Sequence, residues 1–179
     1  MLTKGKTGLV VIDVQGKLST VVHDSERFVA NLVTLIKAAK LLDMPIFWLE
    51  QNPEKLGKTV PELQEVLGSV TPISKFSFSA CGEPAFVEAV KKTKVKTWLL
   101  SGIETHICVY QTTLGLLDLG YEVELVSDCV SSRALSNKVL ALEKLARKGA
   151  EITCLEMCLF ELIGDCRADE FRSALSLIK

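Results

Sequence analysis

The sequence predicts an α/β fold, a doubly wound three-layer α/β/α arrangement with a six-stranded parallel sheet of order 3-2-1-4-5-6. Three observations predict it. Short β-rich runs alternate with longer stretches of helical spacing, the pattern of successive right-handed βαβ units. Residues 8–14 (GLVVIDV) form an almost continuous apolar run, typical of a strand that helices cover on both faces. The length of 179 residues fits one ordinary domain, so we expect residues 1–179 to fold as a single unit.

The first half of the chain supplies three strands. After residues 8–14, a helix is predicted over 25–42, and Asp24 or Ser25 can cap it. Its apolar residues recur at helical spacing at Phe28, Leu32, Leu35, Ile36 and Ala39. The apolar run PIFWLE at 45–50 predicts the second strand, and 70–75 a weaker third. The stretch between them, 51–68, is polar and rich in Pro and Gly, which indicates a long loop with a short helix over 61–67.

The second half repeats the alternation. Strands are predicted over 96–101 (KTWLLS), 122–127 and 151–153, and helices over 83–92, 105–119 and 136–148, with two short helices at the end. Gly120 and Gly149 follow the last two of the longer helices, where glycine is a common helix stop. In a doubly wound sheet the ligand binds beyond the carboxyl ends of the strands, where the strand order reverses. That point lies between strands one and four.

Composition excludes several classes of function. A net charge of -1 argues against nucleic acid as a partner, because such proteins need a basic face. No apolar run approaches the roughly 20 residues that span a bilayer, so no membrane partner is expected. The first residues do not form a signal peptide, which favours a cytoplasmic location and reduced thiols for the six cysteines. No Cys pair has C-x-x-C spacing and only two histidines are present, so we expect no metal and no cofactor.

Two residues flank the predicted switch point. Asp13 interrupts the apolar run of strand one, an unfavourable place for a carboxylate unless it is paired or used in chemistry. The alternative is a strand end in which Asp13 binds loop amides. Cys108 lies near the start of the helix after strand four, where the helix N-terminus favours a thiolate and lowers a thiol pKa. The alternative for Cys108 is a core residue that packs the helix on the sheet.

Lys75 ends strand three, two strands from strand one and so roughly 10 Å away, a distance that a lysine side chain largely covers. A cation there would favour the ionised forms of Asp13 and Cys108. An exposed surface lysine is the ordinary alternative. His106 is two residues before Cys108 and cannot face its thiol on a helix, so a Cys-His pair is less favoured.

Three stretches together resemble the isochorismatase-like cysteine hydrolases over nearly the whole chain. They are LVVIDVQ at 9–15, SKFSFSAC at 74–81 and SGIETHICVYQTTLGLLDLGYEVELVSDCVSSR at 101–133. The resemblance implies the doubly wound fold and homo-oligomers, dimers or larger. It also implies a catalytic triad at Asp13, Lys75 and Cys108, a cis peptide between Ile103 and Glu104, and an oxyanion hole of the backbone N–H groups of Glu104 and Cys108. For the substrate pocket we predict Gln15, Phe76, Phe78 and Thr105 as lining.

The resemblance also separates branches of the family. Nicotinamidases carry an Asp-x-His metal motif after strand two, where this chain has Glu50-Gln51-Asn52-Pro53. True isochorismatases lack the nucleophilic cysteine. The stretch EQNPEKLGKTVPEL at 50–63 resembles the isochorismatase-domain-containing hydrolases of unassigned substrate.

The prediction is therefore a metal-independent cysteine hydrolase that cleaves a small amide or related C–N bond through a thioester. Two alternatives stay open. One is a protein of this fold that binds a metabolite, or acts as a scaffold, without turnover. The other is a redox-sensitive thiol protein in which Cys81 or Cys129 resolves an oxidised Cys108.

Overall fold

The computed structural model describes residues 1–179 and confirms the predicted architecture. Six parallel strands form one sheet in the order β3-β2-β1-β4-β5-β6. Their bounds are β1 Thr7–Ile12, β2 Ile46–Gln51, β3 Ile73–Lys75, β4 Thr97–Ile103, β5 Glu122–Ser131 and β6 Glu151–Thr153. The order reverses between β1 and β4, so this edge is the switch point.

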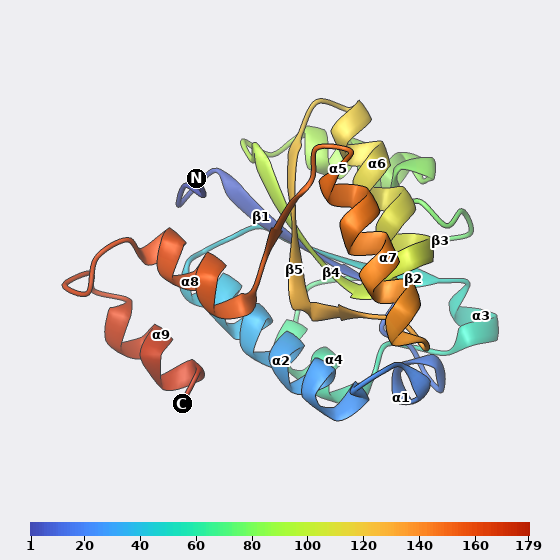
Figure 1. Cartoon of the computed structure of the whole chain (residues 1–179), viewed down its shortest axis with the longest axis horizontal. Coiled ribbons are helices and arrows are strands. Elements are labelled where there is room, and N and C mark those ends of the chain that lie inside the picture. The colour runs from blue at the N-terminus through green and yellow to red at the C-terminus, as the bar shows by residue number, and fades with distance from the viewer.

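Helices cover both faces of the sheet (Figure 1). One face carries α2 (Ser25–Leu41), α4 (Pro61–Leu67), α8 (Leu155–Ile163) and α9 (Phe171–Leu177), and the other carries α5 (Pro84–Lys91), α6 (Tyr110–Asp118) and α7 (Leu135–Ala146). Shorter segments include α1 (Leu18–Val21), α3 (Pro53–Leu56) and the 3₁₀ turn η1 (Ala80–Gly82). None of the helices combines the length and hydrophobicity that crossing a bilayer requires.

The core is split by the sheet into two clusters, and β1 contributes to both. Leu9 and Val11 face the α2 side, whereas Val10 and Ile12 face the α6 side, as the period of two in a strand requires. All six residues of β1 are buried. This burial on both faces explains the continuous apolar run in the sequence, and it makes β1 a rigid support for the residue that follows it.

Several element ends differ from the prediction. β1 ends at Ile12 rather than residue 14, because Asp13 has a left-handed backbone with φ 54° that breaks the strand. β3 begins only at Ile73. β4 and β5 run on to Ile103 and Ser131, with a register shift between residues 100 and 102 where the strands bulge.

Two helix starts also differ. Asp24 stands at the N-cap position of α2 in a left-handed conformation, and its side chain makes no capping hydrogen bond. The helix predicted over 105–119 begins instead as a π-helical segment, η2 (Thr105–Val109), and becomes α-helical at Tyr110. π-Helical turns of this kind are frequent at functional sites.

Candidate active site

Asp13 lies at the switch point, one residue past the end of β1. Its side chain is buried, and its backbone N–H donates to the carbonyl oxygen of Leu49 on β2. Its left-handed φ turns the chain away from the strand direction at this point. The Asp13 backbone is therefore anchored at the ends of β1 and β2 and not in a surface loop.

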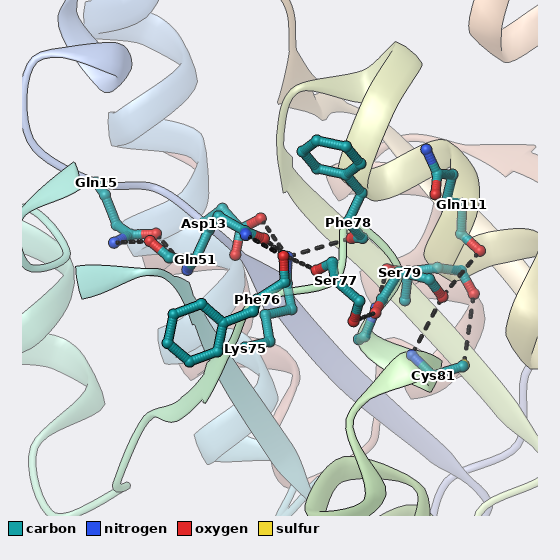
Figure 2. A network of polar contacts seen from close by, with 12 residues as sticks. Asp13, Gln15, Gln51, Lys75, Phe76, Ser77, Phe78, Ser79, Cys81 and Gln111 are labelled. Atoms are coloured by element: carbon teal, nitrogen blue, oxygen red, sulfur yellow. Dashed lines mark hydrogen bonds and ion pairs between the residues drawn. The ribbon is translucent and has the colours of Figure 1, made fainter. Parts of the chain in front are cut away.

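Lys75 ends β3 and reaches the Asp13 carboxylate across β2 (Figure 2). Its Nζ donates to Asp13 Oδ2 at 2.7 Å, and the lysine side chain is fully buried. The same ammonium lies 2.7 Å from Gln51 Oε1, 3.3 Å from the carbonyl oxygen of Ser77 and 3.2 Å from that of Phe78. The alternative of an exposed surface lysine is therefore wrong.

Cys108 lies in η2, beyond the carboxyl end of β4, and is buried. Burial and the negative charge of Asp13 raise the pKa of the Cys108 thiol to about 12, while the charge of Lys75 acts in the opposite direction. The expectation of a lowered thiol pKa is wrong, because desolvation outweighs the favourable field of a helix start. The resting side chain is thus a protonated thiol.

The Asp13 carboxyl has the properties of a base beside that thiol. Burial raises its pKa, while Lys75, then Cys108 and the backbone of Gln51, pull the pKa down. Its second oxygen, Oδ1, is buried without a hydrogen-bond partner. Buried carboxylate oxygens are normally satisfied, so an unpartnered one in a candidate site is available to accept a proton.

The peptide bond between Ile103 and Glu104 is cis, at the position where the family resemblance places such a bond. The Glu104 carboxylate is buried and accepts from the backbone N–H and the guanidinium of Arg133, at 3.1 Å and 3.0 Å. Arg133 lowers the pKa of Glu104, against the effect of burial. This ion pair ties the end of β4 to the segment after β5. Thr105, the next residue, has a buried hydroxyl with no hydrogen-bond partner.

The other three predicted pocket residues fall into two groups. Phe76 and Phe78 follow Lys75 and are 75% and 55% exposed. Gln15 is buried, and its amide binds main chain: Nε2 donates to the carbonyl oxygens of Gln51 and Gly57, and Oε1 accepts from the Gln51 N–H. Gln15 therefore acts on the site through Gln51.

Gln51 is the site residue that the sequence reasoning missed. It ends β2, stands opposite Lys75 in the β2–β3 register, and accepts from the Lys75 ammonium. The signal that could have found it is positional, since β2 lies between the strands that carry Asp13 and Lys75. His106, by contrast, contacts Ser132 and Asn137 and not Cys108.

Cys81 and Cys129, the two cysteines that could resolve an oxidised Cys108, both lie in packed environments. Cys81 lies against Gly115 of α6, where a Cβ would meet the Cys81 sulfur at 2.8 Å, and burial raises the Cys81 pKa to about 11. Cys129 is fully buried on β5, and burial raises its pKa well above the ordinary value. Neither thiol is ionised near neutral pH.

Five cavities of the chain are lined by residues other than Asp13, Lys75 and Cys108. One of about 200 Å³ lies between α2 and β5 at His23, Arg27 and Lys138. The candidate site is defined by its chemistry, because three interacting ionisable side chains meet at the switch point. His, Cys, Asp and Glu side chains do not gather anywhere in groups of three or more with metal-binding geometry.

The fold and the position of these residues define a doubly wound α/β protein with its candidate site at the topological switch point. Comparison with known families makes this specific. The model of the isochorismatase domain matches residues 7–157, and the chain belongs to this hydrolase family. It is 40% identical to the secreted isochorismatase effector Isc1 of Phytophthora sojae, over 91% of this chain and 76% of that protein. It is 35% identical to isochorismatase domain-containing protein 2 of Bos taurus, over 98% and 84% of the two chains.

Solved structures agree with this assignment. The MAR1 ribonuclease of Caenorhabditis elegans superposes with a TM-score of 0.93 at 35% identity, over 99% of this chain and 91% of that one. The YcaC gene product of Escherichia coli, described as an octameric hydrolase of unknown specificity, superposes with a TM-score of 0.92 at 25% identity, over 99% and 88%. YcaC of Pseudomonas aeruginosa, with hexane-2,5-diol and covalent acrylamide, gives 0.92 at 26% identity, over 98% and 90%.

Proposed function

We propose that this chain is a metal-independent cysteine hydrolase that cleaves a small amide or related C–N bond, with Asp13, Lys75 and Cys108 as its catalytic triad. The observation that carries the proposal is the pairing of a protonated buried thiol with a carboxylate whose Oδ1 has no partner. A thiol with a pKa of about 12 needs a base to become a nucleophile, and Asp13 is that base.

The reaction begins with proton transfer from Cys108 Sγ to Asp13 Oδ1 as the sulfur attacks the carbonyl carbon of the amide. Negative charge that develops on the carbonyl oxygen is stabilised by the backbone N–H groups of Glu104 and Cys108. The protonated Asp13 then gives its proton to the amide nitrogen, the C–N bond breaks, and an amine leaves. A thioester on Cys108 remains.

Hydrolysis of the thioester repeats the proton transfers in the same order. Asp13 takes a proton from water, the resulting hydroxide attacks the thioester carbonyl, and the C–S bond breaks. The leaving thiolate recovers the proton from Asp13, which restores the resting state and releases the acid. Lys75 takes no part in the proton transfers; its N–H groups point at oxygen acceptors, and its charge stabilises both Asp13 and the transient thiolate.

The test compares Cys108→Ala with the native chain on a panel of small amides, with mass spectrometry to detect an acyl adduct on Cys108. We expect the native chain to hydrolyse at least one amide and the variant to lose the activity by about a thousandfold or more. Cys166→Ala is the matched control, because Cys166 is exposed on the surface. Amide hydrolysis that survives Cys108→Ala would overturn the mechanism.

Acrylamide is a direct probe of the same thiol. The YcaC structure of P. aeruginosa is described with covalent acrylamide, and acrylamide is a small amide whose alkene is attacked by thiols. A single adduct on Cys108 that is absent in Asp13→Asn would support Asp13 as the base.

Two other functions give different results in these assays. A metabolite-binding scaffold would bind a ligand but form no acyl adduct. A redox-sensitive thiol protein would need a low thiol pKa at Cys108, whereas burial raises that pKa.

RNA should also be tested as a substrate, because the C. elegans structural relative is described as a ribonuclease. We expect no RNA cleavage, because the net charge is -1 and the cations Lys75 and Arg133 are each paired with a carboxylate.

We further infer a cytoplasmic homo-oligomer, a dimer or larger. The octameric assembly of the E. coli relative supports the oligomer, and six unpaired cysteines support a reducing compartment. Light scattering after gel filtration tests the first inference. A mass near 19.6 kDa at micromolar concentration would contradict it.

A further inference from the structure

The Lys75 ammonium has more acceptors than N–H groups. A protonated lysine carries three N–H donors, and here four oxygens lie between 2.7 and 3.3 Å of Nζ. The two short contacts, both 2.7 Å, go to Asp13 Oδ2 and Gln51 Oε1. The carbonyl oxygens of Ser77 and Phe78 share the third N–H group. Gln51 and Asp13 thus determine where the positive charge sits.

Gln51 is itself held at both ends. Its backbone N–H and C=O pair with the side-chain amide of Gln15, and its Nε2 donates to the carbonyl oxygen of Phe76 at 2.6 Å. Figure 2 shows Gln15, Gln51, Lys75 and Asp13 joined in turn by polar contacts. A Gln side chain fixed in this way presents its Oε1 to Lys75 with little freedom to turn.

We propose that Gln51 is a positioning residue for the reaction, and that its amide oxygen holds the Lys75 ammonium in the place where its charge stabilises Asp13 and the Cys108 thiolate. The role of Gln51 in the reaction rests on the proposed function, whereas its effect on the Cys108 thiol does not. The charged groups that act on Cys108 are Asp13 and Lys75, so a displaced ammonium changes the thiol directly. Because the Gln51 amide oxygen acts on Cys108 through Lys75, we expect its loss to lower the rate more than the affinity.

Two substitutions disturb the Gln51–Lys75 contact in different ways. Gln51→Met keeps the approximate volume but removes the acceptor, which leaves a buried N–H of Lys75 without its short partner. Gln51→Glu keeps the acceptor but adds a negative charge beside Lys75. That charge offsets the cation and disfavours a thiolate at Cys108. Both changes destabilise the thiolate relative to the thiol.

The readout is alkylation of Cys108 by iodoacetamide, followed peptide by peptide with mass spectrometry between pH 7 and pH 10. We expect both variants to label Cys108 about tenfold more slowly at each pH, equivalent to a thiol pKa about one unit higher. Cys166 is an internal reference for reagent and pH, since it is exposed in the same molecule. Gln64→Met and Gln64→Glu are matched controls, because the Gln64 amide binds the carbonyl oxygen of Thr59 and does not touch Lys75.

Labelling profiles of Gln51→Met and Gln51→Glu that coincide with those of the native chain and the Gln64 variants would overturn the inference. If Gln51→Met fails to fold, Gln51→Asn replaces it, because Asn keeps a neutral amide but its shorter side chain withdraws the oxygen from Lys75. For a substrate found in the amide panel, kcat should fall about tenfold with KM unchanged. Labelling requires no substrate, so the outcomes are separable. Slower labelling in a chain that hydrolyses no amide supports the role of Gln51 and rejects the proposed function.

Discussion

Gly102 of β4 lies directly against the backbone of Ile12 at the end of β1, where a Cβ on residue 102 would come within 2.0 Å of the Ile12 carbonyl oxygen. The φ of Gly102 is +115°, which other residues rarely adopt. Ile12 precedes Asp13, and Gly102 is two residues before Glu104. This one close approach therefore sets the spacing of the two strand ends that carry the candidate site.

Gly102→Ala should destabilise the fold by about 3 kcal/mol or more, because the new methyl group clashes with backbone and the φ is strained. Urea unfolding measures the loss. Gly5→Ala is the matched control, since Gly5 also has a positive φ, +78°, but a methyl group there would meet nothing within 4 Å. It should cost about 1 kcal/mol. Equal losses in the two variants would show that the contact with Ile12 is unimportant.

The Asp13–Lys75 ion pair predicts strong coupling. Asp13→Asn and Lys75→Met should each destabilise by about 3 kcal/mol, because each leaves its buried partner without an opposite charge. The double variant removes both charges and should cost clearly less than the sum of the single losses. Urea unfolding of the four chains gives the coupling energy. Additive losses, within about 0.5 kcal/mol, would contradict a tight pair.

The arrangement of Asp13, Lys75 and Cys108 around one sheet edge could be predicted from the sequence. The alternation of strand and helix patterns sets a parallel sheet, and right-handed crossovers restrict its order. Once the order is known, residues that follow β1, β3 and β4 must meet at the same edge. Local sequence is sufficient for this because it depends only on which residues end which strand.

The electrostatics of the site could not be predicted in the same way. The raised pKa of Cys108 depends on how completely neighbouring segments exclude water, which no local pattern encodes. The role of Gln51 depends on a side-chain contact across β2 and β3. The left-handed Asp13 and the π-helical start at Thr105 are tertiary outcomes, because packing of adjacent segments overrides local preference at both places.

The cysteines should separate by reactivity. We expect iodoacetamide to label exposed Cys166 first, and the buried Cys129 and Cys158 only when the chain unfolds, because burial raises the pKa of both thiols and blocks access. Cys129→Ala should cost about 1–2 kcal/mol through lost packing on β5, whereas Cys166→Ala should leave the unfolding free energy unchanged. Rapid labelling of Cys129 in the native state would contradict this packing role.

Glu124 on β5 should make stability fall as pH rises. Burial, then the negative charges of Glu161 and Glu151, raise its pKa from 4.5 to about 7. A carboxyl with a raised folded-state pKa binds a proton more tightly in the folded chain than in the unfolded chain. Ionisation of Glu124 therefore destabilises the folded chain. This loss of stability is absent below about pH 4.5, grows between about pH 4.5 and pH 7, and is constant above that range.

Glu124→Gln removes this titration. Relative to the native chain, the variant should gain stability progressively from pH 4.5 to pH 7. The gain should reach about 1–2 kcal/mol, since one pKa unit corresponds to about 1.4 kcal/mol and solvent screens part of the repulsion. Urea unfolding of both chains across this range, in one salt concentration, measures the difference. Glu65→Gln is the matched control, because Glu65 is an exposed glutamate on α4. A Glu124→Gln gain that is independent of pH would mean that burial of a neutral side chain, and not the charge, is responsible.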